Sequence, residues 1–134
     1  MVVDASVWVG RYVPEDVHHA ASLSWFSRGP AQQSSLAVPF LALAEVAGAI
    51  ARRTGHSADA QNAVEHMRAV PGLQMVPLEE SLAVQAAQAA LSYRLRGADA
   101  VYVAVALRLS MPLVTFDNEL AERARAAVEV IQPA

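Results

Sequence analysis

The sequence contains no cysteine and no lysine, and charged residues make up 17% of it. Without cysteine there is no disulfide framework, no thiolate metal site and no cysteine nucleophile, and nothing indicates an oxidising compartment. All ten basic residues are arginine, and the net charge of −3 does not by itself indicate nucleic-acid binding. No uncharged stretch reaches the ~18 residues that span a bilayer, and Asp4 interrupts the only apolar segment near the N-terminus. We therefore expect a cytoplasmic protein without a signal peptide or a membrane span.

Apolar residues are abundant, at 54% of 134 residues. This composition excludes a disordered protein, and the length suits one domain with a substantial core. The chain shows no repeat, low-complexity linker or internal boundary, so we expect a single domain over residues 1–134. Some of the apolar surface is expected to serve a partner.

Short β-like runs alternate with longer helical segments, and this alternation predicts an α/β protein with a central, mostly parallel five-stranded sheet flanked by helices. Strands are expected at residues 1–4, 35–38, 73–76, 113–115 and 128–131. Helices are expected at residues 6–12, 15–26, 39–53, 57–70, 82–94, 98–109 and 119–127. In this scheme Gly29 and Pro30 end the second helix, Pro39 begins the third, and Gly97 separates the fifth from the sixth.

Four carboxylates, unlike the other acids of the chain, lie in otherwise apolar stretches: Asp4, Glu45, Asp99 and Asp117. A buried charge is costly unless something pairs with it, so four such acids suggest a shared cation. Asp4 and Asp117 would follow the first and fourth strands, and ligands of open α/β sheets bind at the carboxyl ends of strands. If these strands are neighbours, the two aspartates meet there, within reach of Glu45 and Asp99.

Such a cluster suits Mg²⁺, a hard ion that takes a few carboxylates and keeps several waters at ~2.0 to 2.1 Å. One or two bound ions can make water nucleophilic and stabilise charge on a phosphate and on the departing oxygen. Phosphodiester hydrolysis then requires no serine or histidine nucleophile.

Each aspartate also has a structural explanation. Asp4 would close a strand, Asp99 would cap a helix after Gly97, and Asp117 would be the N-cap of the last helix. Glu45 is harder to explain in this way, because it lies in the middle of an apolar helix, where an unpaired charge has few structural uses. The joint pattern therefore favours a site.

Four fragments carry these acids through nearly the whole chain: Val2-Val3-Asp4-Ala5-Ser6, Val38-Pro39 followed by Ala44-Glu45-Val46, Gly97-Ala98-Asp99-Ala100, and Leu113-Val114-Thr115-Phe116-Asp117. In this order they resemble the PIN-domain ribonucleases, most closely the VapC-type toxins of bacterial toxin-antitoxin pairs. The resemblance implies a PIN-like three-layer fold and an endoribonuclease that depends on Mg²⁺ or Mn²⁺. It also implies a homodimer, an RNA substrate and a cognate antitoxin protein that covers the active site.

The four acids match the family's acidic quartet. On this resemblance the three aspartates would ligate the ion directly or through water, and Glu45 would act beside them or on the attacking water. Ser6 and Thr115 match hydroxyl positions that help to hold the site, although local hydrogen bonds to the backbone would also explain them. Arg94 and Arg96 could contact RNA phosphates, but a charged helix end is the commoner explanation of such a pair.

Histidine and aromatic residues complete the candidates. The four histidines have no metal-ligand spacing and are expected to face solvent: His18, His19, His56 and His66. Most of the early aromatic residues are expected in the core or on a partner surface and not as platforms for bases: Trp8, Tyr12, Trp25, Phe26 and Phe40.

Two other functions remain open. One is a PIN-shaped protein that binds its antitoxin and represses their shared promoter without significant nuclease activity. The other is a PIN nuclease of RNA processing without a toxin role, and an antitoxin-like reading frame beside the gene would discriminate. A two-component receiver domain is disfavoured because there is no lysine. A haloacid-dehalogenase-type phosphatase is disfavoured because Ser6 stands where a second aspartate is needed.

Overall fold

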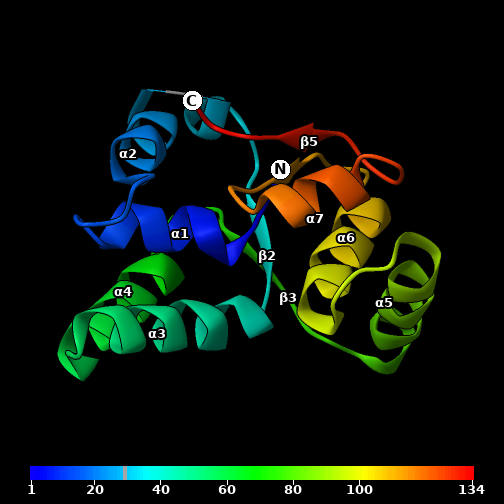
Figure 1. Ribbon diagram of the computed structural model, residues 1–134, viewed down its shortest axis with the longest axis horizontal. Helices are drawn as coiled ribbons and strands as arrows, with labels where there is room; N and C mark the ends of the chain where they lie inside the picture. Colours follow the sequence, from blue (N-terminus) through cyan, green and yellow to red (C-terminus); the bar gives the residue numbers. More distant parts are fainter. Residues whose placement is uncertain (29) are drawn as a thin grey trace.

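The computed structural model describes residues 1–28 and 30–134 and shows a five-stranded sheet with helices on either side (Figure 1). In chain order the elements are β1 (Val2–Val3), α1 (Ala5–Tyr12), α2 (His19–Arg28), a 3₁₀ helix η1 (Pro30–Gln33), β2 (Ala37–Pro39), α3 (Leu41–Thr54), α4 (Ser57–Arg68), β3 (Gln74–Val76), α5 (Glu80–Tyr93), α6 (Gly97–Leu109), β4 (Leu113–Val114), α7 (Asn118–Ala124) and β5 (Val130–Ile131). Gly29, expected to help end the second helix, lies outside the described residues.

The strands run in the order β3-β2-β1-β4-β5, and every pairing is parallel. β1 is therefore central, with Val2 opposite Ala37 of β2 on one side and Leu113 of β4 on the other. β1 and β4 are completely buried, as strands covered on both faces are, and this explains their continuous apolar sequence. The predicted α/β fold with a five-stranded parallel sheet is confirmed.

Helices cover both faces of this sheet. In Figure 1, α1 to α4 lie on one side of the strands, and α5 and α6 lie on the other. α6 packs against β1, β2 and β4, and residues 100–106 are all buried, which explains why this helix is apolar almost all round. Among the described residues, no helix is both long enough and apolar enough to cross a membrane.

Pro39 is the last residue of β2 and does not begin a helix, contrary to the prediction. It lies opposite Val76 of β3, and the N–H of Phe40 donates a 2.9 Å hydrogen bond to the carbonyl of Val76. Because the pairing of β2 with β3 continues through Phe40, α3 begins at Leu41. Proline is tolerated here because the hydrogen bond at this end of the strand uses the N–H of the following residue.

The second helix begins at His19 and not at Glu15, so this prediction was also wrong. The Oδ1 of Asp16 accepts a 2.8 Å hydrogen bond from the N–H of His18, and the Asp16 N–H donates to the carbonyl of Val13. These local bonds hold the segment in turns, which compete with a helical start. The other predicted helices begin and end within about one turn of the observed ones, and Gly97 is the first residue of α6.

Two of the four histidines differ from the expectation. His56 and His66 are exposed, but His18 and His19 are half-buried. The His18 ring stacks on Phe116 with ring centroids 4.2 Å apart, and Nδ1 of His19 lies 2.7 Å from the carbonyl of Gly10. The early aromatic side chains are mostly in the core, as expected, and only Phe40 among them is exposed, at 47%.

Candidate active site: an acidic cleft at the carboxyl ends of the strands

The structure brings the four predicted acids to one cleft. Asp4 follows β1 and Asp117 follows β4, and these strands are neighbours. Glu45 lies in the second turn of α3 and Asp99 in the first turn of α6. The cleft has a volume of about 580 Å³, and its lining residues are Asp4, Ala5, Ser6, Val9, Leu41, Ala44, Glu45, Ala49, Arg52, Arg53, Arg96, Ala98, Asp99 and Asp117. It lies at the topological switch point, where the chain leaves β1 for β2 on one side and returns to β4 on the other.

Asp4 is the most deeply buried of the four acids, with 7% of its surface exposed. Its Oδ2 accepts hydrogen bonds from the Ser6 N–H (3.2 Å), the Ser6 hydroxyl (2.5 Å) and the Thr115 hydroxyl (2.8 Å). The bond from the Ser6 N–H also makes Asp4 the N-cap of α1. Burial raises the pKa of Asp4, although these hydrogen bonds lower it. Together the three hydrogen bonds hold the carboxylate in one orientation.

Thr115 connects Asp4 to the backbone of Asp117. Its hydroxyl is fully buried, donates to Oδ2 of Asp4 and accepts a 3.0 Å hydrogen bond from the N–H of Asp117. In the same way, the Ser6 hydroxyl donates to Asp4 and accepts a 3.0 Å bond from the N–H of Phe116. Each hydroxyl therefore orients Asp4 and satisfies a backbone N–H. The backbone bond is local for Thr115, as the alternative explanation expected, but for Ser6 it comes from the distant Phe116.

Glu45 is oriented by Tyr102, a residue that the sequence did not single out. The Tyr102 hydroxyl donates a 2.6 Å hydrogen bond to Oε2 of Glu45, and the tyrosine is 1% exposed. Burial raises the pKa of Tyr102 and keeps it protonated as a donor. Burial also raises the pKa of Glu45; the tyrosine hydrogen bond lowers it, and the charges of Asp4 and Asp99 raise it further. In sequence Tyr102 is one more apolar residue of α6, and only its hydrogen bond to Glu45 of α3 in the folded protein reveals it.

Arg96 bridges the remaining two acids. Its Nε donates to Oδ2 of Asp99 and its Nη2 to Oδ2 of Asp117, each at 3.1 Å. Burial raises the pKa of Asp99, the Arg96 charge lowers it, and the neighbouring aspartates raise it. The sequence also allowed both aspartates to be helix caps. This is correct for Asp117, whose Oδ1 caps α7 by accepting a 3.0 Å hydrogen bond from the N–H of Leu120. It is wrong for Asp99, because Arg96 occupies the N-cap position of α6.

The donor set of the cleft fits a hard divalent cation. All its candidate ligands are carboxylate oxygens, the kind of ligand that suits Mg²⁺ and Mn²⁺. Beside the effect of burial, the charges of Asp4 and Asp99 raise the pKa of Glu45, and those of Asp4 and Asp117 raise the pKa of Asp99. Within residues 1–28 and 30–134, no three acidic or histidine side chains are arranged tightly enough to hold an ion directly. Mg²⁺ keeps several waters, so one or two direct carboxylate ligands suffice for this ion.

Arg52 and Arg53 also line the cleft, and the sequence had pointed to other arginines. Both follow Glu45 along α3, and a β-carbon on Gly48 would come within 3.1 Å of the Arg52 Nη1 atom. The Arg52 guanidinium therefore lies back along α3, over Gly48. Arg94, by contrast, is the C-cap of α5 and is not among the residues that line the cleft.

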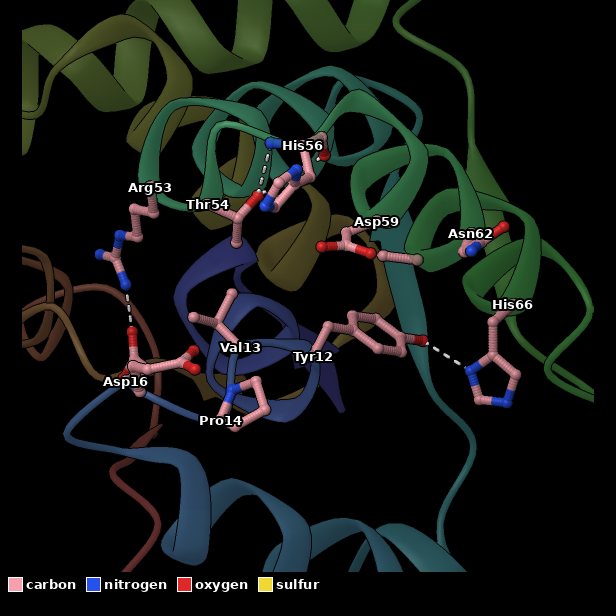
Figure 2. A pocket seen from close by; sticks show the side chains of 12 residues that line it. Tyr12, Val13, Pro14, Asp16, Arg53, Thr54, His56, Asp59, Asn62 and His66 are labelled. Carbon is pink, nitrogen blue, oxygen red and sulfur yellow. Dashed lines mark hydrogen bonds and ion pairs between the residues drawn. The ribbon is translucent and has the colours of Figure 1, made fainter.

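A larger cavity, about 1020 Å³, lies between the end of α1 and the α3–α4 hairpin. Figure 2 shows Arg53 facing Asp16 across it, and the Tyr12 hydroxyl directed at His66, 2.9 Å from Nδ1. Arg53 lines both cavities, so its ion pair with Asp16 marks their boundary. We take the smaller cleft as the candidate active site although it is not the larger cavity, because the carboxylates with raised pKa values lie in it.

The parallel sheet flanked by helices and the acidic cleft at its switch point together define an α/β protein with a candidate metal-dependent site. The family model of the PIN domain matches residues 1–126. The chain therefore belongs to the PIN domain family. Among proteins with curated functions, none matches this sequence.

Several solved structures share this fold. VapC20 of Mycobacterium tuberculosis, described as a sarcin-ricin loop cleaving toxin, is 23% identical, with a TM-score of 0.77 over 96% of this chain and 97% of that one. VapBC2 of Rickettsia felis, bound to a DNA fragment from its promoter, is 10% identical, with a TM-score of 0.71 over 99% and 98%. PAE2754 of Pyrobaculum aerophilum is 22% identical, with a TM-score of 0.66 over 96% and 87%. At these identities the likeness is one of fold.

Proposed function

We propose that this protein is an endoribonuclease dependent on Mg²⁺ or Mn²⁺ and the toxin component of a toxin-antitoxin pair. One observation carries the nuclease proposal: four carboxylates from four separated segments line one cleft. Membership of the PIN family supports it, as does the likeness of fold to a toxin described as cleaving the sarcin-ricin loop. Asp4, Asp99 and Asp117 are the proposed ligands, directly or through water, and Glu45 is the proposed ligand or base.

A bound divalent ion would supply a nucleophilic water and stabilise negative charge on the attacked phosphate. The protein's own part is to position the acids. Ser6 and Thr115 fix the Asp4 carboxylate, and the capping bond to α7 fixes Asp117. Burial raises the pKa of Glu45 and so makes its carboxylate a stronger base toward a proton of water. The hydrogen bond from Tyr102 directs that carboxylate.

We propose that Arg52 and Arg53 contact the RNA backbone. Arg52 lies seven residues after Glu45, two turns further along α3, which places it roughly 10 Å along the helix axis from that acid. Arginine binds phosphate oxygens through its planar fork of donors. Arg52 is exposed and has no side-chain hydrogen bond to the described residues, whereas Arg53 is paired with Asp16. The RNA strand would therefore run from the acids along α3.

The experiment that tests the nuclease is cleavage of pooled cellular RNAs by purified protein, with Mg²⁺ or Mn²⁺ against EDTA. Asp4→Asn tests the site, and Asp59→Asn is its matched control, because Asp59 is an exposed aspartate on α4 outside the acidic cleft. We expect metal-dependent cutting that Asp4→Asn abolishes and Asp59→Asn retains. Equal cutting by wild type and Asp4→Asn would point to a contaminating nuclease and contradict the proposal.

The proposed partners are a cognate antitoxin and a second copy of this chain, and the proposed location is the cytoplasm. The fold is shared with VapBC2, which was solved bound to promoter DNA. Leu91 and Val84 on α5 are 83% and 53% exposed, which leaves apolar surface for a partner. Light scattering should show a dimer, and a monomer at high protein concentration would contradict that part of the proposal.

The toxin role is tested separately from the nuclease. Expression of the chain alone should arrest growth, and coexpression of a small open reading frame adjacent to its gene should restore growth. Cleavage without growth arrest, and without such a reading frame, would favour a PIN nuclease of RNA processing. Binding to the product of that reading frame without any cleavage would favour a regulatory protein.

A further inference from the structure

Arg96 places its guanidinium between two of the proposed metal ligands. Its Nε and Nη2 atoms donate to one oxygen of Asp99 and one of Asp117, and Nη2 lies 4.0 Å from Glu119. Asp99 and Asp117 lie in different elements, at the start of α6 and directly before α7. A single monovalent cation of the chain therefore joins two carboxylates that a divalent cation would also join.

A bound metal ion could readily replace Arg96 as the partner of these two carboxylates. The Arg96 side chain is 65% exposed, so water competes for its donors and each ion pair contributes little. The acids, by contrast, have a strong need for a nearby positive charge. The Asp99 side chain is only 17% exposed, and Asp4, Glu45 and Asp117 lie in the same cleft. A cluster of repelling carboxylates needs positive charge whether or not a metal is present. A hard divalent ion satisfies that need better than an exposed guanidinium.

We infer that Arg96 is a resident counter-ion, which neutralises Asp99 and Asp117 in the metal-free protein and competes with the divalent cation for them. The inference rests on the proposed metal site. The ion has to displace the guanidinium from both carboxylates, so Arg96 weakens metal binding while it partly offsets the repulsion between these acids in the metal-free protein. Once displaced, the guanidinium remains beside the cleft, where it is free to contact a phosphate of the RNA.

The test is a calorimetric titration of Mn²⁺ into the purified, RNA-free protein. Arg96→Gln removes the competing charge, and Arg96→Lys keeps the charge but cannot reproduce the planar bridge to both acids. Arg123→Gln is the matched control, because Arg123 pairs with Glu119 at 3.0 Å and does not bond to Asp99 or Asp117. It removes an equal charge from the same region.

We expect Arg96→Gln to bind Mn²⁺ about fivefold more tightly than wild type, since it removes two exposed ion pairs of modest strength. Arg96→Lys should fall between them, and Arg123→Gln should match wild type. The gain should shrink at high salt, where the ion pairs are already screened. In addition, the Nε–H resonance of Arg96 should shift on saturation with diamagnetic Mg²⁺.

Three results would count against these ideas in different ways. Equal or weaker Mn²⁺ binding by Arg96→Gln, with measurable binding by wild type, would overturn the counter-ion and leave the metal site standing. The same gain in Arg123→Gln would also overturn it, because it would show a general effect of net charge. No saturable binding by wild type or by any variant would overturn the metal site and the counter-ion together.

Discussion

The hydroxyl of Tyr102 donates a 2.6 Å hydrogen bond to Oε2 of Glu45 and so joins α6 to α3 across the acidic cleft. Tyr102→Phe should remove this bond, cost about 1 kcal/mol of stability and reduce cleavage several-fold, because Glu45 loses the group that orients it. Thermal melting and cleavage rates measure the two effects. Tyr93→Phe, at a half-buried position on α5 outside the cleft, is the control. Unchanged cleavage by Tyr102→Phe would exclude a role for this bond.

Thr115→Val should weaken both the metal site and the fold. The valine keeps the volume but leaves Asp4 without one donor and the N–H of Asp117 without its acceptor. We expect a loss of about 1 to 3 kcal/mol in stability and a loss of about 10- to 100-fold in Mn²⁺ affinity. Thr115→Ser retains the hydroxyl and should retain most of the affinity. Equal Mn²⁺ affinities for the valine and serine variants would contradict this.

The metal-free protein should be destabilised by its own acids as the pH rises. Burial raises the pKa of Asp4, Glu45 and Asp99, so at these groups the folded protein binds protons more tightly than the unfolded chain. Their contribution to stability is therefore present below about pH 4, the ordinary carboxyl pKa, and is lost as the pH rises through the folded pKa values.

Glu45→Gln tests this sign. In EDTA its melting temperature should exceed that of wild type by a few degrees at neutral pH, and the advantage should vanish at acidic pH. Saturating Mn²⁺ should stabilise wild type more than the variant. Glu65→Gln, an exposed acid on α4, should follow wild type throughout. If Glu45→Gln melts below wild type in EDTA at every pH, repulsion among the acids does not govern stability here.

Arg52→Gln should weaken RNA binding without changing Mn²⁺ affinity. Measured with the non-cleaving Asp4→Asn protein, the slope of log affinity against log salt should fall by about one if one phosphate contact is lost. Arg68→Gln removes an exposed arginine from the end of α4, away from the cleft, and should leave the slope unchanged. An equal loss in both variants would indicate non-specific attraction.

Arg94 is predicted to be strained. It ends α5 in the left-handed conformation with φ of 54°, which costs a non-glycine residue free energy. Arg94→Gly should therefore stabilise the protein by about 0.5 to 1 kcal/mol, whereas Arg94→Ala retains the strain and should not. Denaturant unfolding distinguishes them. Both variants also test the earlier expectation of an RNA contact: because Arg94 does not line the cleft, RNA affinity should stay close to that of wild type.

The local errors in the predicted fold have a common cause. Pro39 was placed at a helix start, and Glu15 was placed at another because it follows Pro14, since proline favours the first turn. Tertiary and local hydrogen bonds decided otherwise. At Pro39 the pairing with β3 continued one residue further, and near Glu15 the side chain of Asp16 held the chain in turns and paired with Arg53. Neither Val76 nor Arg53 is near these segments in sequence, so periodicity could not reveal the competition.

The sequence by itself determined the class of fold and the identity of the candidate acids. Buried strands must be apolar along their length, and a carboxylate in such a stretch stands out; Asp4 and Asp117 were found in this way. The tertiary structure decided which neutral and basic residues serve those acids. Tyr102 and Arg52 look like ordinary helical residues, and only the folded structure shows that Tyr102 bonds to Glu45 and that Arg52 lines the cleft. Arg96 was visible as a charge, but its bridge between Asp99 and Asp117 depends on where two separate elements begin, and sequence spacing does not encode that distance.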